Sequence, residues 1–251
     1  MNGPPDSPGA GMPGWMRGAT EDPDRPLLAA ATVVVLRDAE PGPEILMLQR
    51  SSAHVFGGMW VFPGGKVEPE DLAAVDGDEV GAARVAAVRE CEEEAGLVVD
   101  VDRLVTLSHW VPPVQAPKRF STWFFLTAAP ERHDVLIDHT EVQNHVWTPA
   151  QSALDRCASK EIELAPPTWM TLAAVTAFDR VADLLSFAAG QPPQYFATRI
   201  LRDGDVPVSL WHGDAAYETG DLTLPGGRRR LRWDPAGWVL DGSAWGAPPP
   251  R

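Results

Sequence analysis

Residues 89–97 read Arg-Glu-Cys-Glu-Glu-Glu-Ala-Gly-Leu, and a glycine-rich turn upstream, at residues 62–66, reads Phe-Pro-Gly-Gly-Lys. In a helix, Glu90, Glu93 and Glu94 fall within an arc of about 100°, because positions three and four apart are surface neighbours. At roughly 5 to 6 Å and an effective dielectric constant near 20, each carboxylate pair repels by about 3 kcal/mol. We therefore expect a cation between them, and ligands made of oxygen alone favour magnesium or manganese over zinc.

This stretch resembles the second half of the Nudix box, the signature of a family of hydrolases. The fixed positions of that half are filled by Arg89, Glu90, Cys91, Glu93, Glu94, Gly96 and Leu97. The first half is represented by Gly65 and, after five residues, by Asp71 in place of a glutamate; 17 residues then separate Asp71 from Arg89, which is longer than the family spacing. The surplus residues, around 73–80, are predicted to loop out before the helix, with Asp78 as its N-cap.

The resemblance implies an α/β fold, a Nudix-type α/β/α sandwich with a mixed sheet. Strands interspersed with helices in two separate places favour the same class. Residues 1–26 lack periodicity and are predicted to be a disordered tail. Residues 27–190 are predicted to form the Nudix hydrolase domain, and residues 191–251 a β-rich C-terminal extension.

The individual elements are predicted from periodicity and turn signals. Strands are expected at 27–36, 44–50, 104–111, 120–127 and 142–147. Three helices are expected: one at 80–95, one that begins with Thr148 as N-cap and Pro149 as first helical residue, and one at 168–189. In the extension, hairpins are expected over 196–211, turning at 203–205, and over 222–233, turning at 225–227. The run Arg228-Arg229-Arg230 is expected on the solvated side of the second hairpin.

The resemblance and the helical stripe together assign the central roles. Glu90, Glu93, Glu94 and the backbone carbonyl of Gly65 are expected to hold Mg²⁺ or Mn²⁺, which bridges phosphate oxygens and lowers the pKa of a water nucleophile. Arg89 lies one helical turn before Glu93 and is expected to orient that carboxylate. The expected enzyme is a hydrolase acting on phosphoanhydride bonds.

The general base has two candidates. Glu93 lies inside the cluster, whereas Glu141 stands six residues before Trp147, a spacing that resembles the additional catalytic or metal-binding glutamate of some Nudix enzymes. A surface-loop position is the alternative for Glu141. His139 and His145 flank it, and either would assist catalysis or be simply exposed.

Cations near the turn are expected to bind the phosphates of the substrate. Lys66 follows the glycine pair, and Lys118 and Arg119 follow a proline-rich loop, so all three are candidate substrate-binding residues. Ordinary surface positions are the alternative for Lys118 and Arg119.

Apolar and sulfur-bearing side chains near the predicted site are ambiguous. Trp110, Trp123 and Phe124 would either stack on a base or lie in the core. Cys91 points away from the carboxylates on the helix, which argues against a nucleophilic cysteine.

The substrate class is suggested by a finer resemblance. Residues 50–65, the long spacer inside the box and residues 116–125 resemble the acyl-coenzyme A diphosphatase branch, over roughly residues 27–175. Coenzyme A or acyl-coenzyme A are the leading substrates, followed by nucleotide sugars, dinucleotides and nucleoside triphosphates. The alternative is a non-catalytic Nudix module for ligand sensing or interaction, although a pure binder has no need of carboxylates that repel. An isomerase on this fold would need its own acid and base pair.

Composition limits the partners. The chain of 251 residues has a formal net charge of -14, which argues against nucleic acid or an anionic membrane as a partner. Two cysteines do not make a disulfide framework, and no apolar stretch is long enough to span a membrane, so a cytoplasmic protein is expected. The sequence leaves the oligomeric state open, with a homodimer as one option.

Overall fold

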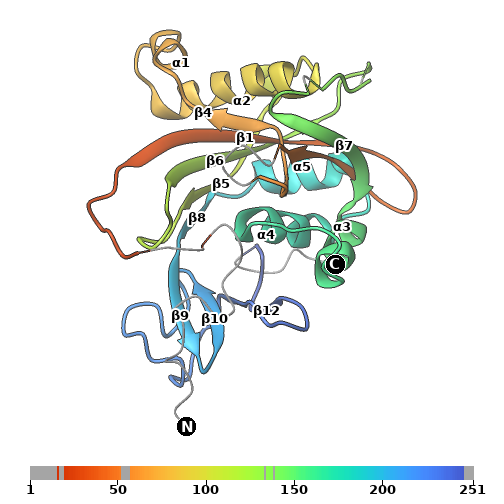
Figure 1. The fold of residues 1–251 in the computed structure, drawn as a ribbon. Helices are drawn as coiled ribbons and strands as arrows, with labels where there is room; N and C mark the ends of the chain where they lie inside the picture. The colour runs from red at the N-terminus through yellow and green to blue at the C-terminus, as the bar shows by residue number, and fades with distance from the viewer. Residues whose placement is uncertain (1–15, 17–19, 52–56, 133, 138, 246–251) are drawn as a thin grey trace.

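The computed structural model describes residue 16 and residues 20–51, 57–132, 134–137 and 139–245 (Figure 1). Most of the predicted tail therefore lies outside the described residues, and its disorder stays a prediction. Residues 52–56, part of the stretch that resembles the acyl-coenzyme A diphosphatase branch, also lie outside them.

A large mixed sheet forms the centre of the molecule. Its strands are β1 (Leu27–Arg37), β2 (Glu44–Arg50), β3 (Trp60–Val61), β4 (Gly64–Lys66), β5 (Val105–Val111), β6 (Arg119–Ala128), β7 (Val142–Pro149) and β8 (Gln194–Ala197). Within the described residues their order is β3-β2-β1-β6-β5-β8, with β4 paired to β1 and β7 to β2. The β1–β6 and β5–β8 pairs are parallel, and the other pairs are antiparallel.

Helices cover both faces of this sheet. On one face lie α1 (Pro69–Ala73) and α2 (Glu79–Ala95), and a 3-10 turn, η2 (Val101–Arg103), follows α2 (Figure 1). On the other face α3 (Ala150–Ala158), α4 (Pro166–Val175) and α5 (Val181–Ala189) share one apolar core with the sheet. The predicted α/β class with helices on both faces of a mixed sheet is confirmed.

Helix α2 begins and ends where the sequence signals it. Asp78 is the N-cap, and its Oδ2 accepts a hydrogen bond from Gly81 N at 2.9 Å. Ala83, Ala86 and Ala87 are fully buried against the sheet, and their small side chains let the helix lie close to it. Gly96 ends the helix with φ 67°, a left-handed conformation that favours glycine. The looped-out segment before the helix is thus present as predicted.

The extension forms a second, four-stranded sheet. Its strands are β9 (Arg199–Asp203), β10 (Val206–Leu210), β11 (Arg230–Arg232) and β12 (Val239–Asp241), in the order β12-β11-β10-β9. The predicted hairpin turning at 203–205 is confirmed, since β9 pairs with β10. The second predicted hairpin is wrong: residues 222–224 form no strand, because Asp221 Oδ1 accepts from Thr223 N at 2.9 Å and fixes a local turn.

Two helix predictions need correction. The helix expected at 168–189 is two helices, because Asp38 Oδ1 accepts from Val181 N at 2.8 Å and caps a new start. The N-cap of α3 is Pro149 and not Thr148, because Thr148 is still paired with Ile45 in the sheet.

The boundary predicted at residue 190 stays a prediction. Strand β8 follows that boundary but pairs with β5 in the large sheet, while only the later strands form the second sheet. The two sheets also share an apolar core that includes Trp211, Leu231 and Trp233 of the extension.

The arginine run is not a solvated edge. Arg230 is 6% exposed and forms an ion pair with Asp214, and the Arg229 guanidinium lies 4.3 Å from the centre of the Phe196 ring. The prediction of a solvated side is therefore wrong for Arg230, which lies in an inner strand of the second sheet, and for Arg229, whose guanidinium packs on Phe196.

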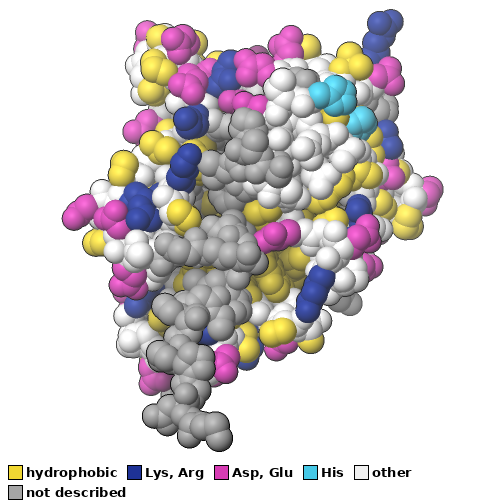
Figure 2. Space-filling model, viewed as in Figure 1, with side chains coloured by type: hydrophobic (Ala, Val, Ile, Leu, Met, Phe, Trp, Pro, Cys, Tyr) yellow, Lys and Arg dark blue, Asp and Glu magenta, His cyan; other side chains and the backbone are white. Residues whose placement is uncertain are grey.

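The surface carries the negative charge unevenly. Acidic side chains gather over α1 and α2, at the top of Figure 2. No helix in the described part of the chain is both long and apolar enough to cross a membrane.

Candidate active site

The glycine pair of the turn is held between β1 and α2. A Cβ on Gly64 would lie 2.4 Å from Ala31 O, and a Cβ on Gly65 would lie 2.3 Å from Glu90 Oε1. The contact at Gly64 is with backbone, so only glycine fits there, whereas a side chain at Gly65 would push the Glu90 carboxylate out of its place. The absence of two side chains thus lets the backbone of β4 lie directly against a carboxylate of α2.

Glu94 lies behind the turn and is almost completely buried. Its Oε2 accepts from Gly64 N at 2.9 Å, and its Oε1 lies 3.3 Å from Arg50 Nη1. The other end of the same guanidinium, Nη2, lies 2.9 Å from Glu141 Oε2. Burial raises the pKa of the Glu94 carboxyl to about 7, although the Gly64 amide and Arg50 oppose the rise. Arg50 therefore links the glutamate behind the turn with the glutamate predicted outside the box.

Arg89 joins the two halves of the box. Its Nε and Nη2 donate to Asp71 Oδ1 and Oδ2 at 3.2 and 2.9 Å. Its Nη1 donates to Glu90 Oε1 at 3.0 Å and to Glu93 Oε2 at 3.1 Å, and its Nη2 also donates to Lys66 O at 3.0 Å. One guanidinium thus fixes α1, the turn and two carboxylates of α2.

Asp71 is held as firmly as its partner. Glu68 N donates to Asp71 Oδ2 at 2.9 Å, which forms part of a capping box at the start of α1. Burial pushes the pKa of Asp71 upward, but the hydrogen bonds from Arg89 and the Glu68 amide lower it overall. The aspartate and the longer spacer therefore still deliver a carboxylate to Arg89.

The predicted metal ligands Glu90, Glu93, Glu94 and the Gly65 carbonyl stay a prediction. Among the described residues, no three His, Cys, Asp or Glu side chains are gathered closely enough to hold a metal ion. In this structure the carboxylates face cationic side chains: Glu90 and Glu93 face Arg89, and Glu94 faces Arg50. The carboxylates offer oxygen atoms alone, and oxygen ligands suit a hard cation such as Mg²⁺ or Mn²⁺.

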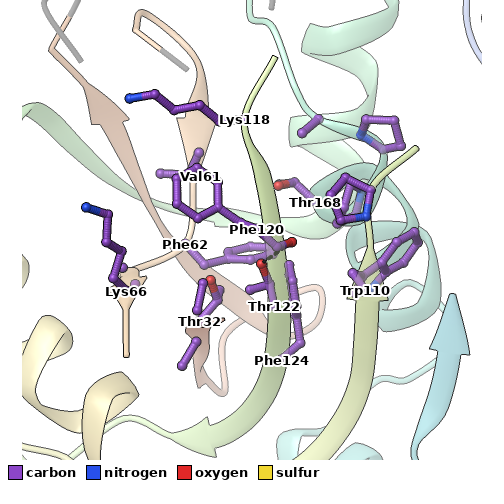
Figure 3. A pocket seen from close by; sticks show the side chains of 18 of the residues that line it. Thr32, Val61, Phe62, Lys66, Trp110, Lys118, Phe120, Thr122, Phe124 and Thr168 are labelled. Carbon is purple, nitrogen blue, oxygen red and sulfur yellow. Dashed lines mark hydrogen bonds between the residues drawn. The ribbon is translucent and has the colours of Figure 1, made fainter. Parts of the chain in front are cut away.

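A pocket of about 610 Å³ opens beside these carboxylates. Figure 3 shows Lys66 and Lys118 on one side of it, Phe62 and Phe120 across its middle, and Trp110 and Thr168 on the other side. The predicted site residues that line it are Gly65, Lys66, Arg89, Glu90, Glu93, Lys118 and Glu141. The pocket thus brings together predicted residues from α2, β4 and two separate loops.

Arg119 does not belong to the pocket, which corrects the prediction of a substrate-binding role. The residue is 9% exposed, and its Nη1 and Nη2 donate to the backbone carbonyls of Arg25 at 3.2 Å and of Pro112 at 3.4 Å. The reason is its place at the first position of β6, where its side chain ties the N-terminal segment to the proline loop instead of facing the lysines.

The ambiguous aromatic residues separate into two groups. Trp110 and Phe124 line the pocket, whereas Trp123 stacks on His109 with ring centroids 4.2 Å apart. Cys91 is fully buried, and burial raises the pKa of its thiol to about 12, which agrees with an inert cysteine.

The two histidines beside Glu141 stay outside the pocket. His139 and His145 are exposed and do not line it. The assisting role considered for them gains no support from this geometry.

Sequence reasoning missed two parts of this site. Arg50 ends β2 and reaches Glu141 only because β2 pairs with β7. The extension contributes the lining residues Thr198, Ile200, Ser209 and Trp233. No local signal marks either part, because both depend on contacts between distant segments.

Comparison with known proteins connects this geometry to a family. The family model described as "NUDIX domain" matches residues 26–179. Human acyl-coenzyme A diphosphatase NUDT19 is 31% identical over 123 residues, which cover 47% of this chain and 33% of that protein. Its counterpart from Gallus gallus is 29% identical over 140 residues, which cover 52% of this chain and 37% of that protein. The chain thus spans about a third of the length of these curated relatives.

A solved structure supports the fold. The crystal structure of a NUDIX hydrolase from Alicyclobacillus acidocaldarius superposes with a TM-score of 0.63 at 24% identity, and the match covers 67% of this chain and 100% of that one.

Proposed function

Because the chain belongs to the Nudix family, we propose that it is a metal-dependent pyrophosphohydrolase that cleaves a nucleoside diphosphate linked to another moiety. Nudix hydrolases generally use divalent metal ions, and they act on phosphoanhydride bonds. The observation that carries the proposal is the arrangement of α2 against the glycine turn. It places Glu90 and Glu93 beside two lysines in one pocket large enough for a nucleotide.

The proposed metal ligands are Glu90, Glu93, Glu94 and the carbonyl of Gly65, with Mg²⁺ or Mn²⁺ as the ion. Their oxygen-only chemistry suits either cation. When bound, the ion supplies charge that neutralises the diphosphate and lowers the pKa of a water. Glu90 and Glu93 lie beside the turn, and both carboxylates pair with the positive charge of the Arg89 guanidinium.

The other residues of the pocket divide into positioning and binding roles. Lys66 and Lys118 are proposed to bind phosphate oxygens, since they are the two exposed lysines of the lining. Glu93 or Glu141 is proposed as the general base. Arg50 lines the pocket, and its ion pairs with Glu94 and Glu141 give it a positioning role as well.

Coenzyme A or acyl-coenzyme A is the proposed substrate, ahead of nucleotide sugars, dinucleotides and nucleoside triphosphates. Support comes from the two relatives that are acyl-coenzyme A diphosphatases, although the aligned part is short. The pocket agrees with such a substrate because its lining includes both charged and apolar residues.

A hydrolysis screen tests the proposal. The protein is incubated with Mg²⁺ or Mn²⁺ and with coenzyme A, hexanoyl-coenzyme A, NADH, ADP-ribose or ATP, and the products are separated by anion-exchange chromatography. We expect cleavage at the diphosphate of the coenzyme A compounds, abolished by EDTA and restored by excess metal. Flat signals over the whole panel would contradict the enzyme and favour a ligand-sensing module.

Asp71→Asn is expected to lower kcat/KM by about tenfold, because positioning partners of metal ligands typically contribute this much. The amide cannot offer Arg89 two anionic oxygens, so Arg89 is free to shift and the carboxylates of Glu90 and Glu93 shift with it. The Mg²⁺ concentration for half-maximal rate is measured alongside, and it should rise.

The controls separate positioning from folding. Glu70→Gln, an exposed change on the same short helix, should leave the rate and the Mg²⁺ midpoint unchanged. Asp71→Glu restores a carboxylate and should recover most of the activity. An unchanged Mg²⁺ midpoint in folded Asp71→Asn would exclude the positioning role.

A further inference from the structure

The pocket has two ends with opposite chemistry. Its ionisable lining residues all come from segments between residues 50 and 141: Arg50, Lys66, Glu68, Arg89, Glu90, Glu93, Lys118 and Glu141. These residues lie around the turn, on the facing side of α2 and at the end of the loop that leads into β6. A diphosphate with its counter-charges therefore belongs at this end.

The opposite wall carries no ionisable side chain among the described lining residues. It is built from the end of β5 and its proline loop, the N-terminal turn of α4 and the extension. Its members are Trp110, Val111, Pro112, Pro113, Ala165, Pro166, Pro167, Thr168, Thr198, Ile200, Ser209 and Trp233. This apolar wall could not compensate a buried charge, because its polar side-chain groups are hydroxyl and indole N–H groups, none of them charged.

The pairing of the second sheet explains which of its residues reach the pocket. Ser209 stands opposite Ile200 on β9 and opposite Leu231 on β11, so the three side chains share one face of that sheet. Val208 and Leu210 alternate with Ser209 and pack on the other face, in a separate small core with Ala216 and Tyr217. The extension therefore turns one complete face toward the Nudix domain.

That face is fixed to the Nudix domain by close packing. The indole of Trp110 stacks on Phe196 of β8 with ring centroids 3.9 Å apart, and Trp211 packs edge-on against both rings. Trp211 Nε1 donates to Thr198 Oγ1 at 3.0 Å, and Thr198 N donates to Val111 O at 2.9 Å. The apolar wall is thus a built surface rather than a loose contact.

Ser209 adds a polar atom to this wall. Its side chain is fully buried, and in the described part of the chain its Oγ has no hydrogen-bond partner. Buried hydroxyl groups normally have a partner, and leaving one without is costly. An Oγ at the pocket lining without a partner therefore indicates that a ligand group completes its hydrogen bond.

We propose that the extension forms a specificity subsite for the group attached to the diphosphate, and that this group is uncharged, mostly apolar and hydrogen-bonded to Ser209 Oγ. The inference rests on the proposed function and names the substrate class of the same site. A chain of methylene groups with amides or a thioester fits this description, whereas a second phosphate or a carboxylate does not.

The test uses a probe without a diphosphate, so that it does not depend on turnover. Binding of hexanoyl-pantetheine to the full chain is measured by isothermal titration calorimetry for the wild type and for three variants. Ile200→Trp fills the subsite and should weaken binding at least about tenfold, while Ser209→Ala removes one hydrogen bond and should weaken it about fivefold. Val239→Trp adds the same bulk on β12, where the side chain is 53% exposed and outside the pocket, and should change nothing.

The outcomes distinguish the subsite from the enzyme. If Ser209→Ala and Ile200→Trp both bind the probe as the wild type does, or if the wild type does not bind it at millimolar concentration, the subsite is overturned even when coenzyme A compounds are hydrolysed. If no diphosphate is hydrolysed but binding is lost in both variants, the proposed function fails and the subsite stands. Ser209→Ala keeps the test decisive if Ile200→Trp does not fold.

Discussion

Glu93→Gln is expected to lower kcat for metal-dependent hydrolysis on the order of 1,000-fold, because the amide removes a negative charge where the phosphate-bound cation must be held. The fold should survive. The Glu93 side chain is 58% exposed, and its ion pair with Arg89 is of the i, i+4 surface type that contributes about 0.3 to 0.5 kcal/mol. The variant thus separates chemistry from stability, and kcat together with the urea midpoint measures both.

Glu92→Gln is the matched control for this prediction. Glu92 is the preceding residue of α2, is exposed and does not line the pocket, so the same chemical change should leave kcat unaltered. Glu94→Gln extends the test to the buried member of the cluster; it retains an oxygen for Gly64 N but loses the charge facing Arg50. Wild-type turnover in Glu93→Gln would show that the metal site has been assigned to the wrong residues.

The carboxylate stripe could be predicted because the rule behind it is local. Helical geometry alone places Glu90, Glu93 and Glu94 on one side of α2, and the glycine turn lies beside them in the structure. The looped-out spacer before α2 could also be predicted, because a turn signal precedes Asp78, which is the N-cap of the helix. The pair of Arg89 with Glu93 was predicted, but its pair with Asp71 was not, because residues 71 and 89 meet only once α1 folds back onto α2.

The parts that sequence reasoning missed depend on long-range contacts. The break between α4 and α5 is set by Asp38, which is 143 positions from the amide that it caps. The direction of Arg119 is set by the carbonyl of Arg25, 94 positions away, so a strand residue that looks free to bind phosphate is used to fix the N-terminal segment. The apolar wall depends on the packing of Trp211 against Trp110, a contact that no periodic pattern in the sequence predicts.

Asp214→Ala is expected to destabilise the protein by about 3 to 5 kcal/mol, the effect of leaving a buried charge without its partner. The Asp214 carboxylate is fully buried and accepts from Arg230 Nε at 2.7 Å and from Arg230 Nη2 at 2.5 Å. It also accepts from the amides of Ala216 and Arg229, each at 2.9 Å. Without it, Arg230 stays buried in β11 and loses its ion-pair partner. Urea unfolding at pH 7, followed by circular dichroism, measures the loss.

The pH dependence of this effect has a definite sign. Burial alone would raise the pKa of Asp214, but the hydrogen bonds from Arg230 and the two amides lower it overall. A carboxyl whose pKa is lower in the folded state than its unfolded value of about 3.9 stabilises the fold fully above that value. The contribution is lost as the pH falls through the folded pKa. The stability difference between the wild type and Asp214→Ala should therefore shrink as the pH is lowered below about 4.

Asp241→Ala tests whether the size of the effect comes from burial. Asp241 pairs with Arg228 in the same sheet, but the distance is 3.6 Å and the Asp241 side chain is 50% exposed, so the expected loss is at most about 1 kcal/mol. Because β11 leads directly into Trp233 of the apolar wall, Asp214→Ala should also weaken hexanoyl-pantetheine binding, and Asp241→Ala should not. Equal stabilities for the two variants would mean that the Asp214–Arg230 pair does not hold β11 in place, and the apolar wall would need another anchor.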